Sequence, residues 1–356
     1  MPNGLREIVR WCARCTVALV SASTVLLVIG YKIGPESAWP LALLQYVPHI
    51  FLLLTLTSVA LSLVLGLRWW VVSISCFAAY VTIVMGLELN IRDHGTRQTR
   101  LMTYNVKSYL TAYGPVGMWP IKFEIDLHDA DIIVLQDAGN LVAMLNETPK
   151  AASLLFGSRN LYTYGQYVVA SRYSLRHCRP GSISYREKPH TYVRCVIDVN
   201  GFEIDLFTTH FLTPRDGLNA VRHDQLRGIS EWKQNIEDRM SQAKNLAQDI
   251  HASSRPIIVA GDLNATEHSL VIRTLLGTGI RDAFSAAGSG FGYTYGHALW
   301  PGISFMRIDH VLVDPQIGVA DCFVGGEQGS THRAVIADLT IAHLVIRRRS
   351  SSVFRI

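Results

Sequence analysis

The 356-residue sequence predicts an α/β (α+β) domain behind a membrane anchor of three transmembrane helices. Three long apolar stretches fill the first hundred residues, and short β-rich runs alternate with polar and helical segments afterwards. Charged residues make up only 17% of the chain, against about 25% in typical soluble domains. The net charge of +5 lies mostly in residues 1–100, which hold eight Lys and Arg against four Asp and Glu. These features exclude a disordered chain, a disulfide-framework miniprotein and a generally basic nucleic-acid-binding domain.

The predicted anchor covers residues 1–90, with helices over residues 15–31, 46–67 and 69–87. Each stretch is close to the ~20 residues that a helix needs to cross a bilayer. A single stretch of this kind is equally typical of a buried core helix or a signal peptide, but three in succession favour a membrane anchor. Residues 91–100 then form a linker to the domain.

Arginines beside these helices indicate the orientation of the anchor. Arg6, Arg10 and Arg14 precede the first helix and Arg68 lies in the second turn, which places both regions in the cytoplasm. Three crossings then place the domain outside the cytoplasm. Arginines at positions 92, 97 and 100 favour the opposite orientation, although a long following domain overrides such flanking charge.

The rest of the chain predicts one domain over residues 101–342 and a basic tail over residues 343–356. A helix is expected over residues 219–252, where apolar residues recur at helical spacing. Cys178 and Cys195 flank a Gly- and Ser-rich turn, so a disulfide between them is an option if the domain lies outside the cytoplasm. The β-rich runs lie at residues 101–106, 131–135, 167–171, 192–199, 203–208 and 256–260.

Polar side chains follow several of these runs, at the strand ends where an α/β scaffold gathers its site residues. Carboxylate and amide oxygens are ligands that Mg²⁺ prefers, an Asp can take a proton from water, and a His oriented by a carboxylate can stabilise phosphate oxygens. Each residue alone is also typical of a turn or a helix cap, and only their joint occurrence in this order predicts a catalytic site. The residues are Asn105, Asp137, His210, Asp262, Asn264, Asp309 and His332.

The motifs that contain these residues resemble those of the endonuclease/exonuclease/phosphatase superfamily, the deoxyribonuclease I-like hydrolases. The resemblance covers residues 100–342. With predicted membrane helices in front, the chain further resembles the bacterial membrane-anchored branch that includes teicoplanin-resistance proteins, which implies a multi-pass protein of the bacterial inner (cytoplasmic) membrane. The motifs are Met102-Thr103-Tyr104-Asn105-Val106, Asp131-Ile132-Ile133-Val134-Leu135-Gln136-Asp137, Thr208-Thr209-His210, Gly261-Asp262-Leu263-Asn264-Ala265, Arg307-Ile308-Asp309-His310 and Ser330-Thr331-His332-Arg333.

The resemblance implies a four-layer sandwich of two packed β-sheets flanked by helices. It also implies hydrolysis of a phosphate ester with Mg²⁺, or Mn²⁺, as the cofactor. The residue roles that it implies are metal binding by Asn105 and Asp137, activation of water by Asp262, phosphate contacts from Asn264 and His210, and transition-state stabilisation by His332, oriented by Asp309.

Two positions depart from the family pattern, both on the metal-binding side. Asp137 stands where the family usually has Glu, so its carboxylate is one methylene shorter. Thr331 replaces the Asp that usually precedes the final His, and its hydroxyl is a weaker, neutral ligand whose role stays open. Because the other six site positions keep the family's residues, we expect an active enzyme with altered metal affinity.

The anchor indicates the class of substrate, because it holds the site near a bilayer and raises the effective concentration of lipid head groups. We therefore expect the bilayer as a partner and a lipid-linked phosphate ester, phosphodiester or pyrophosphate as the substrate. A nuclease is one alternative, although residues 101–356 carry a net charge of only +1 and lack a basic bias. A non-catalytic sensor of a phosphate ligand is the other. The head group, the bond cleaved and the oligomeric state stay open.

An aromatic-rich segment precedes Asp309 in the sequence. It is typical of a substrate rim or a membrane-contacting loop, and equally of ordinary core packing. Its members are Phe291, Tyr293, Tyr295, Trp300 and Phe305.

Overall fold

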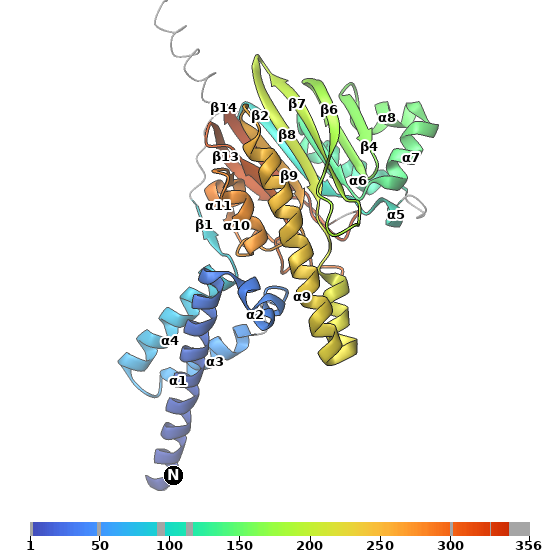
Figure 1. The fold of residues 1–356 in the computed structure, drawn as a ribbon. Helices are drawn as coiled ribbons and strands as arrows, with labels where there is room; N and C mark the ends of the chain where they lie inside the picture. Colours follow the sequence, from blue (N-terminus) through green and yellow to red (C-terminus); the bar gives the residue numbers. More distant parts are fainter. Residues whose placement is uncertain are drawn as a thin grey trace, which may run out of the picture. The chain divides into compact units, whose positions relative to one another are not determined.

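The computed structural model describes residues 3–47, 51–90, 97–111, 117–299, 302–327 and 329–341. The predicted tail, Trp300 and most of the predicted linker lie outside these ranges. The chain divides into two compact units (Figure 1). One unit comprises Met1–Glu88 with the loop Thr266–Leu270, and the other comprises Leu89–Ala265 with Val271–Ile356.

Helices make up the first unit, and two of them are long and apolar enough to cross a membrane, over Arg6–Ile33 and Leu67–Val84. The prediction of a third full-length helix over residues 46–67 is wrong, because the described part of this stretch is helical only over Leu52–Ser62. Eleven residues span about 16 Å, well short of a ~30 Å hydrocarbon core. The uncharged run indicated apolar length but not the turn that ends the helix after Ser62. The elements are α1 (Asn3–Ile33), η1 (Pro35–Ser37), α2 (Trp39–Leu44), α3 (Leu52–Ser62), α4 (Leu67–Ala79) and η3 (Tyr80–Val84).

Within this unit α1 and α4 run in the same direction, and α3 returns between them (Figure 1). The Cys76 thiol of α4 lies 3.9 Å from the Ser21 carbonyl oxygen of α1. The Ser58 and Ser73 hydroxyls form a buried hydrogen bond of 3.2 Å between α3 and α4. Such small polar residues are typical of helix contacts in a membrane.

Two six-stranded sheets form the second unit, with strand orders β10-β12-β9-β8-β7-β6 and β13-β14-β2-β3-β5-β4. Each sheet contains one parallel pair, β8 with β9 and β2 with β3, and its other neighbours are antiparallel. The strands are β1 (Glu88–Leu89), β2 (Thr99–Asn105), β3 (Ile132–Gln136), β4 (Asn160–Tyr164), β5 (Tyr167–Ser171), β6 (Ser174–Ser182), β7 (Thr191–Val199), β8 (Phe202–His210), β9 (Ile257–Asp262), β10 (Arg281–Asp282), β11 (Ser289–Gly290), β12 (Asp309–Val313), β13 (Ile317–Val324) and β14 (Val335–Ile341).

Buried apolar side chains form three layers in this unit. Alternate residues of both sheets, such as Val134 and Leu206, fill the core between the sheets. Helices α6 to α8 cover the outer face of the β2 sheet, and α9 with α10 covers that of the β8 sheet. This arrangement confirms the predicted four-layer sandwich. The helices are α5 (Ser108–Thr111), α6 (Trp119–His128), α7 (Gly139–Glu147), α8 (Pro149–Phe156), α9 (Arg215–His251), α10 (Leu270–Leu276) and α11 (Ala283–Ala287).

Helix α9 begins four residues before the predicted helix and doubles back on itself. A Cβ atom on Gly217 would lie 2.7 Å from the Trp232 ring, and one on Gly228 would lie 2.0 Å from the Ala220 carbonyl oxygen. In a straight helix Gly217 and Trp232 would be about 22 Å apart. The two glycines therefore allow the first turns of α9 to pack directly against its long C-terminal part.

Cys178 of β6 and Cys195 of β7 form a disulfide in the structure. Pairing of the two strands brings these cysteines together, as the sequence allowed but did not decide. Cys322 is buried and free. The disulfide links the edge strand β6 to its neighbour β7, because β6 is the terminal strand of the β8 sheet.

Candidate active site

Most of the predicted site residues meet at one edge of the sandwich, where strands of both sheets end. Asn105 ends β2, whereas His210 and Asp262 end the parallel strands β8 and β9 side by side. Asp309 begins β12 directly opposite Asp262 in the antiparallel register. The pairing of β9 with strands on both sides therefore places Asp262 at the centre of the group.

Asp262 is buried and uses both of its carboxylate oxygens. Its Oδ1 accepts a hydrogen bond of 2.9 Å from the backbone N–H of Asn264, and its Oδ2 accepts one of 2.8 Å from Asn105 Nδ2. The same Oδ2 lies 3.4 Å from His210 Nε2 and 3.8 Å from His332 Nε2. Asn105 therefore bridges the two sheets and fixes the direction of the carboxylate.

His332 and Asp309 form a buried pair, with 2.9 Å between His332 Nδ1 and Asp309 Oδ2. The Tyr295 ring packs against the imidazole at 4.8 Å and holds it in place. Burial lowers the pKa of His332 to about 4 and raises that of Asp309 to about 7. Because both shifts favour the neutral forms, the two side chains together bind one titratable proton between about pH 4 and pH 7.

His210 faces Asp262 from the end of β8. Its Nδ1 lies 2.8 Å from Gln166 Oε1, and its backbone N–H donates to the Tyr167 hydroxyl at 3.1 Å. Burial lowers the pKa of His210 to about 4, so the ring is neutral near pH 7. The hydrogen bond to Gln166 places the proton on Nδ1 and directs the Nε2 lone pair toward the site.

Asn264 lies beside Asp262 in the left-handed region, with φ of 48°. Its Nδ2 donates a hydrogen bond of 2.9 Å to the Phe211 carbonyl oxygen, and Arg239 donates one of 3.1 Å to the carbonyl oxygen of Asn264. An Asn tolerates this backbone conformation better than most residues. These contacts fix the Asn264 side chain beside Asp262, and its predicted role toward phosphate stays a prediction.

Asp137 faces a cation that the sequence analysis did not include, the ammonium group of Lys107. Lys107 Nζ and Asp137 Oδ2 are 2.8 Å apart, and both residues have positive φ, 44° and 50°. Burial by itself lowers the pKa of Lys107, but the negative charges of Asp262 and Asp137 outweigh it and raise this pKa. Lys107 therefore marks a strongly negative position between the two carboxylates.

A group of three residues presents donor atoms suited to a divalent cation. Ligand atoms of Asp262, Asp309 and His332 lie within 4.8 Å of one another, and all three residues are buried. Asp309 Oδ1 is buried and has no hydrogen-bond partner among the described residues, which leaves it available as a ligand. Two carboxylates and an imidazole suit Mn²⁺ or Zn²⁺ as well as Mg²⁺. The predicted ligands Asn105 and Asp137 lie outside this group and stay predictions, as does half-buried Thr331.

Replacing Lys107 by Met tests how the site holds a cation. Because an ammonium between Asp137 and Asp262 repels a divalent cation, we expect Lys107→Met to lower the metal concentration for half-maximal activity at least about fivefold. The measurement is a titration of hydrolysis with Mg²⁺ and with Mn²⁺. Lys188→Met, at an exposed position, removes the same charge elsewhere and should leave the titration unchanged. A requirement for more metal in Lys107→Met would contradict competition between the lysine and the cation.

The structure adds three residues to the predicted set. Lys107 directly follows the motif that contains Asn105, and this nearness is its only sequence signal. Gln166 lies in the turn between β4 and β5 and carries no sequence signal. Tyr295 belongs to the aromatic-rich segment, and its ring contact with His332 was not among the roles that the sequence indicated for that segment.

Comparison with known proteins identifies the same region. A family model described as the Endonuclease/Exonuclease/phosphatase family matches residues 102–332. No curated protein sequence matches the chain. The family match spans every predicted site residue, from Asn105 to His332.

Solved structures of low sequence identity share the fold. The endonuclease/exonuclease/phosphatase from Bacteroides vulgatus is 18% identical, with a TM-score of 0.51, and covers 68% of this chain and 98% of its own. A humanized D. rerio TDP2 is 14% identical, with a TM-score of 0.52 and the same two coverages. D. rerio TDP2 complexed with single-strand DNA product is also 14% identical and covers 68% and 98%, with a TM-score of 0.50. At these identities the similarity establishes the fold.

Proposed function

This chain belongs to the endonuclease/exonuclease/phosphatase family, a family of phosphoester hydrolases, and from that premise we propose that it is a membrane-anchored, metal-dependent phosphoesterase acting on a lipid-linked substrate. The observation that carries the proposal is the oriented Asp262 carboxylate. Asn105 fixes it from the other sheet, and His332, paired with Asp309, lies 3.8 Å from the same carboxylate oxygen. A base and a proton donor thus flank one position, as attack of water on a phosphorus atom requires.

In the proposed mechanism Asp262 orients the attacking water and takes its proton. His332, with Asp309 behind it, donates a hydrogen bond to a phosphate oxygen as negative charge develops there. Neutral His210 contacts the same phosphate through Nε2, by way of a proton on the substrate or a water molecule. Asn264, two residues after Asp262, offers its side-chain amide to the phosphate.

We assign the cation to the oxygens of Asn105 and Asp137, with Mg²⁺ as the first candidate and Mn²⁺ as the second. Lys107 supports this assignment, because its ammonium lies where Asp137 and Asp262 attract positive charge. Oxygen donors of this kind fit Mg²⁺. When bound, such a cation offsets phosphate charge and lowers the pKa of a bound water. The assignment leaves Asp262 and His332 for proton transfer.

The lipid-linked class of substrate is supported by the first unit of the chain. Two of its helices are long and apolar enough to cross a membrane, and a site tethered to a bilayer meets lipid phosphates at high effective concentration. Binding of such a substrate then needs no large basic surface on the protein. The proposed branch, resembling teicoplanin-resistance proteins, rests on this architecture.

An extracytoplasmic catalytic unit is supported by two features. The Cys178–Cys195 disulfide is typical of a compartment outside the cytoplasm. Because α1 and α4 run in the same direction, the chain leaves the anchor on the side of the bilayer opposite its N-terminus if α1 crosses the bilayer. This holds whether α3 and α4 cross fully or form a re-entrant hairpin. Alkaline phosphatase fused to the C-terminus should therefore be active in cells, and an inactive fusion would place the catalytic unit in the cytoplasm.

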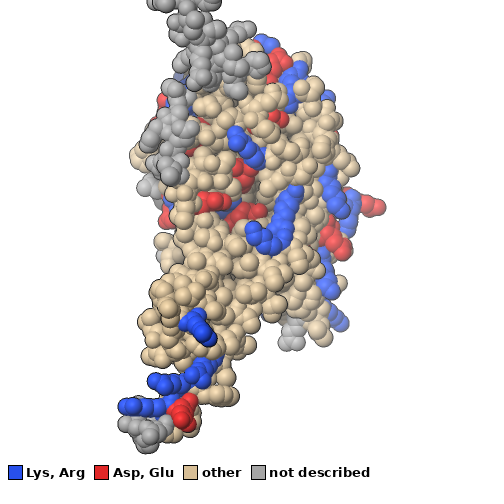
Figure 2. Space-filling model, turned by 90° about the vertical axis from the view of Figure 1, so that its left-hand side faces the viewer, with Lys and Arg blue, Asp and Glu red and all other residues tan. Residues whose placement is uncertain are grey.

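A nuclease is the second candidate, because D. rerio TDP2 of the same fold is complexed with single-strand DNA product. Nucleic-acid binding usually requires a basic tract. On the face shown in Figure 2, Lys and Arg side chains are interspersed with Asp and Glu. The charge distribution therefore favours a lipid substrate over DNA.

A hydrolysis panel tests the proposal with the full chain in mixed micelles. Undecaprenyl pyrophosphate, phosphatidylinositol phosphate, phosphatidylglycerol and single-stranded DNA are supplied with Mg²⁺, Mn²⁺ or EDTA. We expect metal-dependent turnover of a lipid substrate at least about tenfold faster than that of DNA. Turnover of DNA alone would establish the nuclease, and no turnover with any substrate would favour a phosphate sensor.

A further inference from the structure

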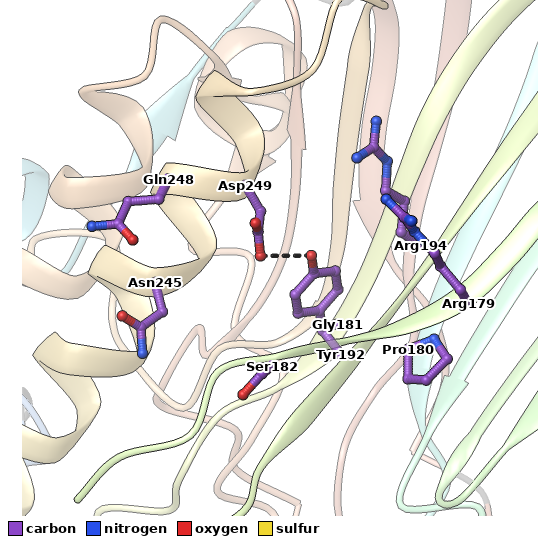
Figure 3. A pocket seen from close by; sticks show the side chains of 9 residues that line it. All are labelled: Arg179, Pro180, Gly181, Ser182, Tyr192, Arg194, Asn245, Gln248 and Asp249. Atoms are coloured by element: carbon purple, nitrogen blue, oxygen red, sulfur yellow. Dashed lines mark hydrogen bonds between the residues drawn. The ribbon is translucent and has the colours of Figure 1, made fainter.

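An open groove lies on the outer face of the β8 sheet, between strands β6 and β7 and the C-terminal part of α9. Its volume is about 490 Å³, and none of the residues proposed for hydrolysis lines it. Figure 3 shows two arginines on the strand side, facing polar side chains of the helix. The lining residues are Arg179, Pro180, Gly181, Ser182, Tyr192, Arg194, Asn245, Gln248 and Asp249.

Arg179 and Arg194 form the basic wall of the groove. They lie directly opposite each other in the antiparallel register of β6 and β7, where like charges destabilise a sheet. Arg194 Nη2 pairs with buried Asp205 at 2.5 Å, so its charge is compensated. Arg179 is exposed, and its guanidinium forms no hydrogen bond or ion pair with another described residue. An anion at this position would compensate the second guanidinium.

A second hollow of about 340 Å³ shares the same two arginines and adds Arg255 and His177. Arg255 pairs with Glu203 at 2.7 Å, so its charge is partly compensated. The two hollows therefore meet at the Arg179–Arg194 pair. Of the two guanidinium groups that both hollows share, Arg194 is paired with Asp205, and Arg179 has no ion pair with a described residue.

The helix wall presents amide and carboxylate groups of α9, and the hydroxyl groups of Tyr192 and Ser182 add polar atoms from the strands. The Tyr192 hydroxyl donates a hydrogen bond of 2.7 Å to Asp249 Oδ2, drawn in Figure 3. Gln248 is exposed and forms no side-chain hydrogen bond with another described residue. Ser182 also lines the groove. A carboxylate with amides accepts hydrogen bonds from hydroxyl groups and repels a second anion, so this wall fits the uncharged end of a ligand.

The strands that form the basic wall are held in place without a ligand. The Cys178–Cys195 disulfide joins β6 to β7 next to the Arg179–Arg194 pair. The Tyr192 ring packs across Gly181, where a Cβ atom would lie 2.1 Å from the ring. A preformed site of this kind loses little conformational entropy when it binds.

We propose that this groove is an accessory binding site for a phosphate ester of a polyol or sugar. The phosphate binds Arg179 and Arg194, and the hydroxyl groups bind Ser182, Gln248 and Asp249. Guanidinium groups bind phosphate through paired charge-assisted hydrogen bonds. A soluble sugar phosphate and a phosphoinositide head group share this chemistry.

Calorimetric titration of the full chain in detergent micelles tests the site, with EDTA present so that no metal contributes. The probes are glucose 6-phosphate, inorganic phosphate, glucose, and phosphatidylinositol 4-phosphate in mixed micelles. We expect saturable binding of glucose 6-phosphate that Arg179→Gln weakens at least about tenfold. Gln248→Ala should weaken glucose 6-phosphate but not inorganic phosphate. Binding of the lipid as well would identify the head group as a source of the ligand.

Arg176→Gln is the matched control, because exposed Arg176 lies on the same strand, pairs with Asp198 and lines neither hollow. The affinity of Arg176→Gln for glucose 6-phosphate should equal that of the wild type. Asp262→Ala should also retain binding, which separates this site from the proposed catalytic one. Equal affinity of Arg179→Gln and wild type, loss of binding in Asp262→Ala, or no saturable binding of any phosphate probe would overturn the proposal.

Discussion

Replacing Asp262 by Asn is expected to lower kcat about 10³-fold, the largest effect of any single substitution in this chain. A neutral amide cannot take a proton from water, and general-base catalysis typically contributes ~10²–10⁴-fold. The measurement is steady-state hydrolysis of the best substrate of the panel at saturating metal. We expect a much smaller change in KM, because Asp262 acts on the water rather than on the substrate.

The same substitution affects stability, because the amide nitrogen of Asn would face the Asn105 Nδ2 group that now donates to Asp262 Oδ2. Two facing donors leave a buried hydrogen bond unmade, at a cost of ~1–3 kcal/mol in the free energy of unfolding. Thermal unfolding therefore accompanies the kinetics. Asp126→Asn, which changes an exposed Asp on α6, is the control and should alter neither quantity. Retention of more than a tenth of wild-type kcat by a folded Asp262→Asn protein would exclude Asp262 as the base.

Replacing His332 by Ala is expected to lower kcat about 10²- to 10³-fold, as removal of one preformed hydrogen-bond donor to a developing oxyanion does. His332 is held by Asp309 at 2.9 Å and by the Tyr295 ring, so its position is fixed before substrate binds. His223→Ala, at an exposed position of α9, is the matched control. An equal loss in both variants would point to a general effect of the substitution on the protein.

The buried His332–Asp309 pair also predicts how the rate depends on pH. Burial raises the pKa of Asp309 to about 7, so the shared proton is present below that value and lost above it. Below pH 7 the pair presents an Nε2–H donor to the phosphate, and above pH 7 the Nε2 carries only a lone pair. We expect kcat/KM to fall about tenfold per pH unit above pH 7. Asp309→Asn should remove this fall in kcat/KM above pH 7 while the protein stays folded. An unchanged fall would show that another group causes it.

The membrane anchor illustrates a partial success of sequence analysis. Residues 15–31 and 69–87 predicted two apolar helices that the structure contains, because an uncharged run of sufficient length is visible locally. The middle stretch satisfied the same criterion, but among its described residues the apolar helix covers only Leu52–Ser62. The end of a helix depends on turns and on contacts with neighbouring helices. The length of an apolar run in the sequence does not indicate either of them.

The sequence by itself determined the sandwich fold, the family and the strand-end residues that form the candidate site. Strand patterns and motif order are local properties, and parallel or antiparallel pairing then brings strand ends such as Asp262 and Asp309 together. Only the tertiary structure decided that Lys107 pairs with Asp137, that α9 doubles back, and that Arg179 lies opposite Arg194. These features depend on strand register and on the direction of side chains far apart in the sequence, and neither follows from the local pattern of residues.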